Sequence, residues 1–350
     1  MYPANPSSLT ESHSGHDLIL GMILLALFLG ENQKLKLDFS KSQRLKTAFW
    51  FNFVLPRALK KNKIDLFFTP NIFLPFKKST IFEVIAVHDL CWKEKRKWKN
   101  LGFLAYSLMF EERSIKRANQ IVALSKTTKK QIEKFYPFAQ KKVQVVYGGI
   151  KKIFFEKKSK NALEKIKQKY NLPSFFILFV GKIEERKNIK TVLETIRLLK
   201  KDESFKKLSL VIVGNLTKGG KKYKKEMKKS SFVYWLKDLT DFELSCIFKL
   251  ASLFFLPSFC EGFGLPVLEA MASSLPVVTS NIPLFVEIVK DAGIMRHPED
   301  AKGFAKEIKR ILKDKDLYKE LQKRSQKRAK KFLFEKTSQR LVEIFNSFSL

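Results

Sequence analysis

The sequence predicts an α/β protein built from two doubly wound domains that face a central cleft. A chain of 350 residues is too long for one small core, because domains usually hold about 100–200 residues. Short apolar runs rich in Val, Ile and Phe recur without alternating with polar residues, which is typical of strands buried on both faces of a parallel sheet. Amphipathic stretches separate the runs, and strand and helix in alternation indicate βαβ units.

The apolar runs are predicted as strands, and the stretches between them as helices. The expected strands cover residues 64–68, 81–87, 120–124, 143–147, 175–180, 208–213, 232–236, 253–256 and 276–279. Helical spacing is clearest at residues 191–199 and 241–251. In such sheets, ligands bind beyond the carboxyl ends of the strands. We therefore expect the chemistry in the loops that directly follow strands.

The domain boundary is expected in the lysine-rich segment 151–173, after a strand that ends at Gly148 and Gly149. Residues 1–150 are assigned to an N-terminal Rossmann-like domain and residues 151–330 to a C-terminal one. Residues 331–350 are predicted to form a helix that packs back toward the N-terminal domain.

The apolar run 18–29 is twelve residues long, short of the about 20 that a membrane-spanning helix needs. A signal peptide is not indicated, because residues 1–17 hold no Lys or Arg. The run is predicted as a buried helix of the first domain, with a membrane-inserted hairpin or anchor as the alternative.

The formal net charge of +34 has two readings, a polyanionic partner or a compositional drift toward lysine. Nucleic-acid readers and phosphate clamps favour arginine for its planar fork. Only 12 of the 68 basic residues are Arg, so a basic nucleic-acid-binding protein is the remote alternative.

A loop with glycines and a glutamate follows the strand predicted at residues 253–256. Gly262 and Gly264 let the backbone approach a ligand closely. The helix that follows offers free N–H groups to an anionic phosphate. Glu261 lies before this helix and Glu269 about one turn inside it, and two carboxylates beside a phosphate suggest recognition of sugar and ribose hydroxyls. The alternative is a helix N-terminus with favourable acidic residues.

Cations follow the strand predicted at residues 175–180, namely Lys182, Arg186 and Lys187. Fixed cations in such a loop can stabilise the negative charge that develops on a leaving diphosphate. In a chain this rich in lysine, accident is the competing explanation.

The second half of the chain resembles the nucleotide-sugar-binding domain of GT-B glycosyltransferases, in the large retaining group called family 4. That group's signature is two glutamates separated by seven residues, matched by Glu261 and Glu269. Its members commonly carry a G-x-x-x-x-R-K-N loop after a strand, matched by Gly181 and residues 186–188. The resemblance is strong over residues 175–300 and looser in the first half.

The resemblance implies roles for these residues. Arg186 and Lys187 would hold the donor diphosphate, with Lys182 assisting, and Glu269 would bind the nucleotide ribose. Glu261 would contact the donor sugar. The backbone beside it would do the same, over Gly262, Phe263, Gly264 and Leu265.

In the first half, His88 and Asp89 follow the strand predicted at residues 81–87, where cleft residues lie. A histidine can exchange protons near neutral pH, although a lone histidine is more often structural. The resemblance favours function, because V-H-D at this point is common in the family and faces the acceptor and the donor sugar. Ser125 opens a predicted helix, as a plain N-cap or as the acceptor-side serine that family members often have here.

The implied activity is a retaining hexosyltransferase that uses a UDP- or GDP-sugar and a glycan or lipid-linked acceptor, in cell-surface polysaccharide or glycolipid synthesis. A mannosyltransferase is one candidate, and front-face displacement is the expected mechanism. Family members usually open with a strand and a Gly-rich loop, and neither precedes residue 18. The first domain is therefore expected to lack its first strand, and a GT-B-shaped binding or assembly subunit that no longer catalyses is the alternative.

No cofactor and no metal are expected. No D-x-D motif follows a strand, and Asp314 with Asp316 is predicted as a cap between two helices. The histidines and cysteines lack the spacing of a zinc site.

Basic residues alternate with Trp92 and Trp98 in the segment 92–99, and an apolar stretch follows at residues 101–110. This pattern suits an anionic membrane surface, and a solvated loop before an ordinary core helix is the alternative. A cytoplasmic protein, peripheral on the inner face of the membrane, is the expectation.

Overall fold

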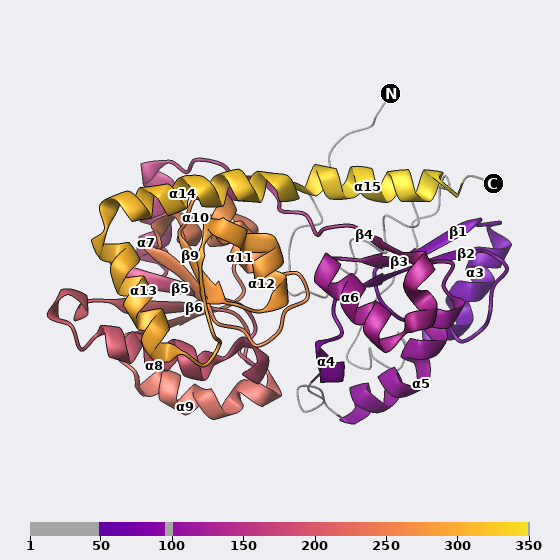
Figure 1. Ribbon diagram of the computed structural model, residues 1–350, viewed down its shortest axis with the longest axis horizontal. Coiled ribbons are helices and arrows are strands. Elements are labelled where there is room, and N and C mark those ends of the chain that lie inside the picture. The colour runs from indigo at the N-terminus through magenta and orange to yellow at the C-terminus, as the bar shows by residue number, and fades with distance from the viewer. Residues whose placement is uncertain (1–48, 95–100, 349–350) are drawn as a thin grey trace. The chain divides into compact units, whose positions relative to one another are not determined.

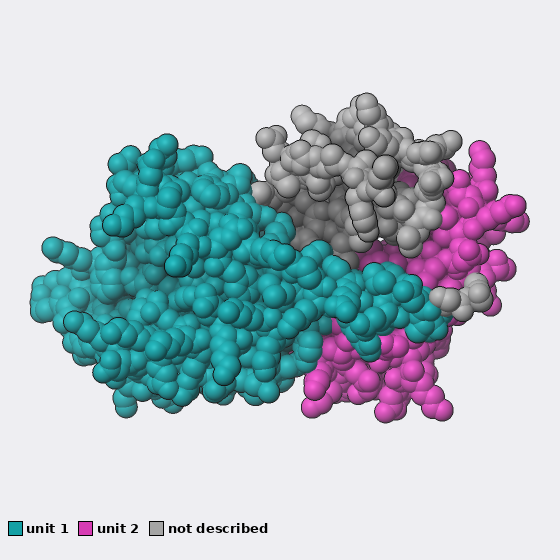
Figure 2. Space-filling view, turned by 90° about the horizontal axis from the view of Figure 1, so that it is seen from above, with its two compact units in different colours: residues 1–13, 147–350 teal, residues 14–146 magenta. Residues whose placement is uncertain are grey.

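The structure is a computed structural model that describes residues 49–94 and 101–348. The chain divides into two compact units, with the division between Val146 and Tyr147. Unit 2 covers the described residues up to 146, and unit 1 covers those from 147 onward (Figures 1 and 2). The apolar run 18–29 lies outside the described residues.

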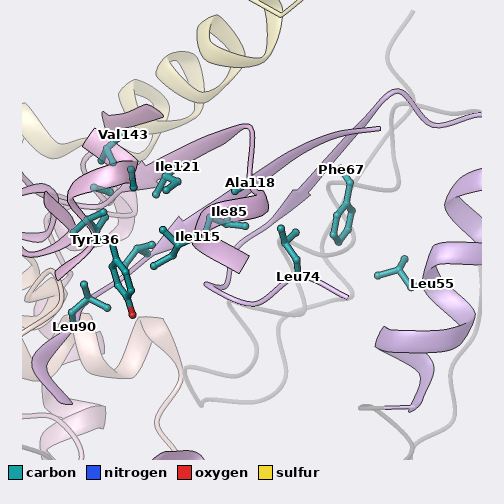
Figure 3. Close-up of a cluster of buried hydrophobic side chains, with 14 of the residues drawn as sticks. Leu55, Phe67, Leu74, Ile85, Leu90, Ile115, Ala118, Ile121, Tyr136 and Val143 are labelled. Carbon is teal, nitrogen blue, oxygen red and sulfur yellow. The ribbon is translucent and has the colours of Figure 1, made fainter. Parts of the chain in front are cut away.

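Unit 2 is built on a parallel sheet of four described strands in the order β1-β2-β3-β4. These strands are β1 (Leu66–Thr69), β2 (Phe82–Val87), β3 (Gln120–Ala123) and β4 (Val143–Val145). The helices are α3 (Leu55–Lys61), α4 (Cys91–Glu94), α5 (Leu101–Arg117) and α6 (Lys126–Phe135), with a π-helix at Trp50–Val54 and a 3-10 helix at Pro137–Lys142. Ile85, Ile115, Ile121 and Tyr136 lie in the apolar core of this unit (Figure 3).

Unit 1 holds a parallel sheet in the order β10-β9-β8-β5-β6-β7. Its strands are β5 (Phe176–Val180), β6 (Ser209–Val213), β7 (Val233–Leu236), β8 (Leu253–Leu256), β9 (Val277–Ser280) and β10 (Ile294–Arg296). Counted from β5, this is the 3-2-1-4-5-6 order of dinucleotide-binding folds. Successive strands are added in one direction from β5 to β7 and in the opposite direction from β8 to β10. The strand order therefore reverses between β5 and β8, where such sheets bind their ligands.

Helices cover both faces of the unit 1 sheet (Figure 1). The helices of unit 1 are α7 (Lys160–Lys169), α8 (Ile189–Leu199), α9 (Lys221–Lys229), α10 (Asp241–Leu250), α11 (Leu265–Ala272), α12 (Pro283–Val289), α13 (Ala301–Lys313), α14 (Lys315–Ala329) and α15 (Phe334–Asn346), of which α15 does not lie on this sheet. Short 3-10 turns lie at Lys152–Phe154, Glu185–Lys187, Glu203–Phe205, Lys218–Gly220, Lys290–Ala292 and Lys330–Phe332. The residues of β5, β6, β8 and β9 are all buried, which explains why β5 and β8 are wholly apolar and β6 and β9 largely so.

The segment that enters unit 1 is bound to the segment that precedes α15. Ile150 donates its backbone N–H to the Phe332 oxygen at 2.8 Å, and Phe334 donates to the Ile150 oxygen at 3.1 Å. The Thr337 hydroxyl donates to the Tyr147 oxygen at 2.7 Å. Two stretches that are far apart in sequence thus form a short parallel bridge.

Every predicted strand is confirmed within a few residues, and so is the prediction of parallel sheets. The prediction missed β10. The cap predicted at Asp314 is confirmed, since its carboxylate accepts from the backbone N–H groups of Asp316 and Leu317. Among residues 49–94 and 101–348, no helix has the length and apolar character needed to cross a membrane.

Candidate functional site

Two loops meet at the reversal point of the unit 1 sheet. One follows β5 and runs from Gly181 to Asn188, and the other follows β8 and runs from Pro257 to Gly264. Because β5 and β8 are paired in parallel, their carboxyl ends lie at the same edge of the sheet. The loops are joined by a backbone hydrogen bond of 2.9 Å from Phe259 N–H to the Arg186 oxygen.

The loop after β5 is shaped by Gly181 and Asn188. Gly181 has φ +151°, and a Cβ there would lie 3.3 Å from Cε of Lys187, so the Lys187 side chain lies across the end of β5. Asn188 adopts the left-handed conformation, which asparagine tolerates better than most residues. Its side-chain amide donates to the backbone oxygens of Pro257 at 3.0 Å and Pro298 at 2.7 Å. The asparagine of the R-K-N pattern thus ties this loop to its neighbours.

Glu261 and Lys187 form a buried ion pair at the meeting point of the loops. Both residues are 6% exposed. The Lys187 ammonium donates to both carboxylate oxygens of Glu261, at 2.6 and 2.8 Å. Glu261 also accepts from the Ser258 hydroxyl at 2.6 Å and from the Arg186 guanidinium at 3.2 Å. Three donor side chains therefore converge on one carboxylate.

The charges of this cluster shift one another's protonation. Burial acts to raise the pKa of Glu261, but the positive charges of Lys187 and Arg186 outweigh it and hold that pKa below its ordinary value. Burial lowers the pKa of Lys187, and the Glu261 carboxylate counteracts this. Arg186 also pairs with Glu184, through contacts of 3.1 and 2.8 Å. The cluster is thus an ionic network that two acidic side chains neutralise.

The helix α11 begins beside the cluster. Gly264 precedes it with φ +74°, a conformation that strains other residues, and Pro266 lies in its first turn. Phe263 is buried, and its ring contacts those of Tyr147 and Phe332 at centroid distances of 6.2 and 6.0 Å. The Phe263 side chain is therefore part of the packing of unit 1, which leaves its backbone for the predicted donor contact.

Glu269 lies on α11, eight residues after Glu261, and its side chain keeps some contact with solvent. The protein around it is nevertheless dense. Burial and the negative charge of Asp241 raise the pKa of Glu269 to about 8, and the positive charge of Lys151 acts against them. Lys151 and Asp241 form an ion pair with each other. The pKa of Glu261 is thus lowered by its surroundings, whereas that of Glu269 is raised.

Lys182 is exposed and takes no part in the ionic network. The residue after it, Ile183, bridges to Leu216 in the loop that follows β6. The structure brings Arg186, Lys187 and Glu261 together, and it places Lys182 elsewhere in the same loop.

In unit 2, the predicted residues His88, Asp89 and Ser125 lie at the carboxyl ends of neighbouring strands. His88 Nε2 lies 2.8 Å from the Pro70 oxygen, and Asp89 accepts from the Cys91 backbone N–H at 3.0 Å. Ser125 is fully buried, and its hydroxyl accepts from the Thr128 N–H at 2.9 Å as the N-cap of α6. This cap accounts for the serine, and its acceptor-side role stays a prediction.

The residues that support these predicted ones were not predicted from the sequence. Ser258 holds Glu261, and Thr128 and Gln131 of α6 contact the backbone at His88 and Leu90, at 3.2 and 3.3 Å. Ser258 lies three residues before Glu261, so proximity in sequence was an available signal. The α6 residues carried none, since they lie about 40 residues from their partners.

The interpretation of Trp92 as a membrane-facing residue is wrong. Trp92 is 3% exposed, and its indole N–H donates to the buried Glu111 carboxylate at 3.1 Å. Tyr136 donates to the same carboxylate at 2.5 Å, and the Lys93 ammonium lies 4.8 Å from the Trp92 ring centre. An indole that finds a buried hydrogen-bond partner packs inward. Trp98 lies outside the described residues.

Family models match both halves of the chain. Residues 160–331 match the family described as "Glycosyl transferases group 1", and residues 32–152 match "Glycosyltransferase Family 4". The chain belongs to the group 1 glycosyltransferases. It is therefore a glycosyltransferase enzyme, as the glutamate signature and the R-K-N loop indicated.

Among curated relatives of this glycosyltransferase is O-antigen chain mannosyltransferase B of Escherichia coli. It is 25% identical over 300 residues, which cover 82% of this chain and 76% of the relative. O-antigen chain mannosyltransferase RfbU of Salmonella typhimurium is 27% identical over 281 residues, covering 78% and 73%.

Solved structures share the fold of this glycosyltransferase. Sucrose-phosphate synthase from Thermosynechococcus elongatus superposes with a TM-score of 0.73 at 17% identity, covering 97% of this chain and 95% of that one. WaaG, a glycosyltransferase involved in lipopolysaccharide biosynthesis, gives 0.69 at 19% identity, covering 90% and 88%. Anabaena HepE in complex with UDP-glucose gives 0.68 at 17% identity, covering 84% and 81%. The GT-B fold expected from the sequence is confirmed.

Proposed function

We propose that this glycosyltransferase moves a hexose from a nucleoside diphosphate sugar to a glycan or lipid-linked acceptor in cell-surface polysaccharide synthesis. The buried Lys187–Glu261–Arg186 cluster at the reversal point of the sheet is the observation that carries the proposal. It places two cations and a carboxylate where folds of this strand order bind nucleotides. Relatives named as O-antigen mannosyltransferases support mannose as the sugar to test first.

The chemistry follows from the charges of the cluster. Transfer leaves negative charge on the departing diphosphate, and Lys187 and Arg186 are fixed cations that stabilise it. Glu261 accepts hydrogen bonds from the hydroxyls of the transferred sugar, and Glu269 from the ribose. Lys182 assists as an exposed cation of the same loop, and the backbone from Gly262 to Leu265 completes the donor site.

Retention by front-face displacement is part of this proposal. The leaving phosphate takes the proton of the acceptor hydroxyl, which enters from the same face of the sugar. His88, Asp89 and Ser125 are proposed for the acceptor side. Proton NMR of the freshly formed product, compared with the donor, reads the anomeric configuration directly, and inversion would refute this mechanism.

A donor screen tests the proposal. The purified chain is incubated with UDP-, GDP- and ADP-sugars and a mixture of glycan and lipid-linked acceptors, and products are read by mass spectrometry. A mass gain of one hexose with a single donor class is the expected result. Donor binding without transfer to any acceptor would favour the alternative of a non-catalytic binding or assembly subunit.

We expect transfer to continue in EDTA, because side-chain cations take the part that a divalent ion plays at a diphosphate. The described residues hold no cluster of three His, Cys, Asp or Glu side chains that could bind a metal. Initial rates with and without excess EDTA are the measurement. Loss of activity in EDTA with recovery on adding Mg²⁺ or Mn²⁺ would contradict metal-free transfer.

Peripheral attachment to the inner face of the cell membrane is proposed for unit 2. Leu108 and Met109 on α5 are 53% and 67% exposed, and a basic stretch of sequence precedes this helix. Apolar side chains beside basic residues favour an anionic bilayer surface.

We expect the chain to sediment with anionic vesicles and salt to weaken this binding, because exposed charges are screened. Replacing Leu108 and Met109 together by serine should reduce binding about tenfold through the lost apolar burial. Phe138→Ser serves as the control, since Phe138 is exposed but lies outside α5. Equal binding to neutral and anionic vesicles would leave the charge without a role.

A further inference from the structure

The diphosphate clamp of the proposed function is occupied in the structure by a side chain of the protein itself. The Lys187 ammonium donates to both oxygens of Glu261, at 2.6 and 2.8 Å, and both residues are buried. Glu261 takes two of the three N–H donors of this ammonium, so a diphosphate that engages more than the remaining one must displace the carboxylate from Lys187. A carboxylate and a phosphate present the same kind of acceptor to an ammonium group, so one can replace the other.

Glu261 is built to lose this partner without becoming an unpaired charge. Its carboxylate keeps the Ser258 hydroxyl at 2.6 Å and the Arg186 guanidinium at 3.2 Å when Lys187 leaves. A buried carboxylate with no partner would be strongly unfavourable. Among the described residues, the hydrogen bonds of the Lys187 ammonium go to Glu261 alone, so this buried charge needs either the carboxylate or an incoming anion.

We propose that Glu261 competes with the diphosphate of the donor for Lys187, and that its return to Lys187 after transfer expels the nucleoside diphosphate. This inference rests on the proposed function. Before reaction, the donor supplies sugar hydroxyls to Glu261 as well as phosphate to Lys187, so both charges gain a partner. After transfer the sugar is gone, Glu261 loses that partner, and the ion pair with Lys187 forms again. The same residue thereby favours the sugar-bearing donor over the sugar-free product.

The affinity for the sugar-free nucleotide separates this role from a contact with the sugar. UDP and GDP have no sugar for Glu261 to contact, so a residue that only binds the sugar has no effect on them. If Glu261 competes for Lys187, Glu261→Gln removes the competing charge and frees the ammonium for phosphate. We expect Glu261→Gln to bind the preferred nucleotide about tenfold or more tightly than the wild type, with slower dissociation.

Glu184→Gln is the matched control. Glu184 is an acidic partner of Arg186 at 2.8 Å, but its side chain is 24% exposed and, unlike Glu261, accepts no hydrogen bond from the Lys187 ammonium. Its loss removes one negative charge, as Glu261→Gln does, but from the neighbouring loop after β5. A gain of less than about threefold is expected there, because exposed pairs contribute little. An equal gain in both variants would show general electrostatics and overturn the proposal.

Isothermal titration with UDP and with GDP gives the affinities, and stopped-flow displacement gives the dissociation rates. Circular dichroism establishes that each variant is folded. Should Glu261→Gln not fold, Glu261→Asp withdraws the carboxylate by one methylene and should show a smaller gain in the same direction. Unchanged or weaker nucleotide binding in the folded variant overturns the exchange while leaving the proposed function intact. Absence of nucleotide binding in the wild type would overturn both.

Discussion

Replacing Lys187 by alanine should lower kcat/KM by about 10²–10³-fold, the usual cost of removing one preorganised group that stabilises transition-state charge. Lys187 lies across the end of β5 and is held in place by Glu261, so its ammonium needs little reorganisation when the diphosphate departs. Arg186→Ala should act in the same direction. Steady-state kinetics with the donor identified in the screen provide the measurement.

Lys190→Ala is the control for this experiment. Lys190 is an exposed lysine in the first turn of α8, three residues beyond Lys187 and outside the ionic network. Removing one partner of a buried pair also costs stability, about 3–5 kcal/mol, so thermal unfolding must accompany the kinetics. Normal turnover in a folded Lys187→Ala variant would show that the loop after β5 does not hold the diphosphate.

At a pH above about 8, where Glu269 is ionised, Glu269→Gln should raise the donor KM about ten- to a hundredfold with little change in kcat. The contact of Glu269 is with the ribose, a part of the donor that does not change during transfer, so its loss weakens ground state and transition state alike. A charge-assisted hydrogen bond of about 1.5–3 kcal/mol sets this range. A fall in kcat with KM unchanged would mean that the roles of Glu261 and Glu269 are reversed.

The same residue should make donor binding depend on pH. The pKa of Glu269 is raised to about 8 by burial and by the charge of Asp241. The carboxylate accepts ribose hydroxyls better than the neutral acid, so donor affinity should rise as the pH passes upward through about 8. Glu269→Gln should flatten this profile. Asp241→Asn should move its midpoint to lower pH, because it removes a charge that raises the pKa.

Stability gives a readout of Glu269 that needs no donor. Below its ordinary pKa of 4.5, Glu269 is protonated in both the folded and the unfolded chain, so it does not make the free energy of unfolding depend on pH. Between that value and about 8, the unfolded chain loses the proton while the folded one keeps it, so the free energy of unfolding falls as pH rises. Allowing for partial exposure, Glu269→Gln should be more stable than the wild type by about 2–3 kcal/mol above pH 8.

The fold could be predicted from sequence because its strands are buried on both faces. A run such as Phe176–Val180 contains only apolar residues, which is typical of strands in a parallel sheet. Strand β10 is the exception that was not predicted. It has three residues, ends on the exposed Arg296 and lies at the sheet edge, so it carries no apolar run.

The candidate site was predictable to the level of loops but not of contacts. Parallel strands put the loops after β5 and β8 at one edge, and the sequence placed cations in one and a glutamate in the other. It did not show that Lys187 and Glu261, 74 residues apart, would neutralise each other. The prediction for Trp92 was wrong for a similar reason, because its hydrogen-bond partner Glu111 lies 19 residues away on α5. Pairings across such separations depend on tertiary packing, which local patterns do not encode.

The bridge between the segments around Ile150 and Leu333 decides where this protein can be cut for expression. A fragment that begins at residue 151, where the sequence suggests a boundary, loses the N–H that serves the Phe332 oxygen and the carbonyl that accepts from Phe334. It also leaves the Thr337 hydroxyl without the Tyr147 oxygen. A fragment that begins at Tyr147 and extends through α15 keeps all three hydrogen bonds. Unit 1 is therefore best produced from Tyr147, four residues before the boundary at residue 151.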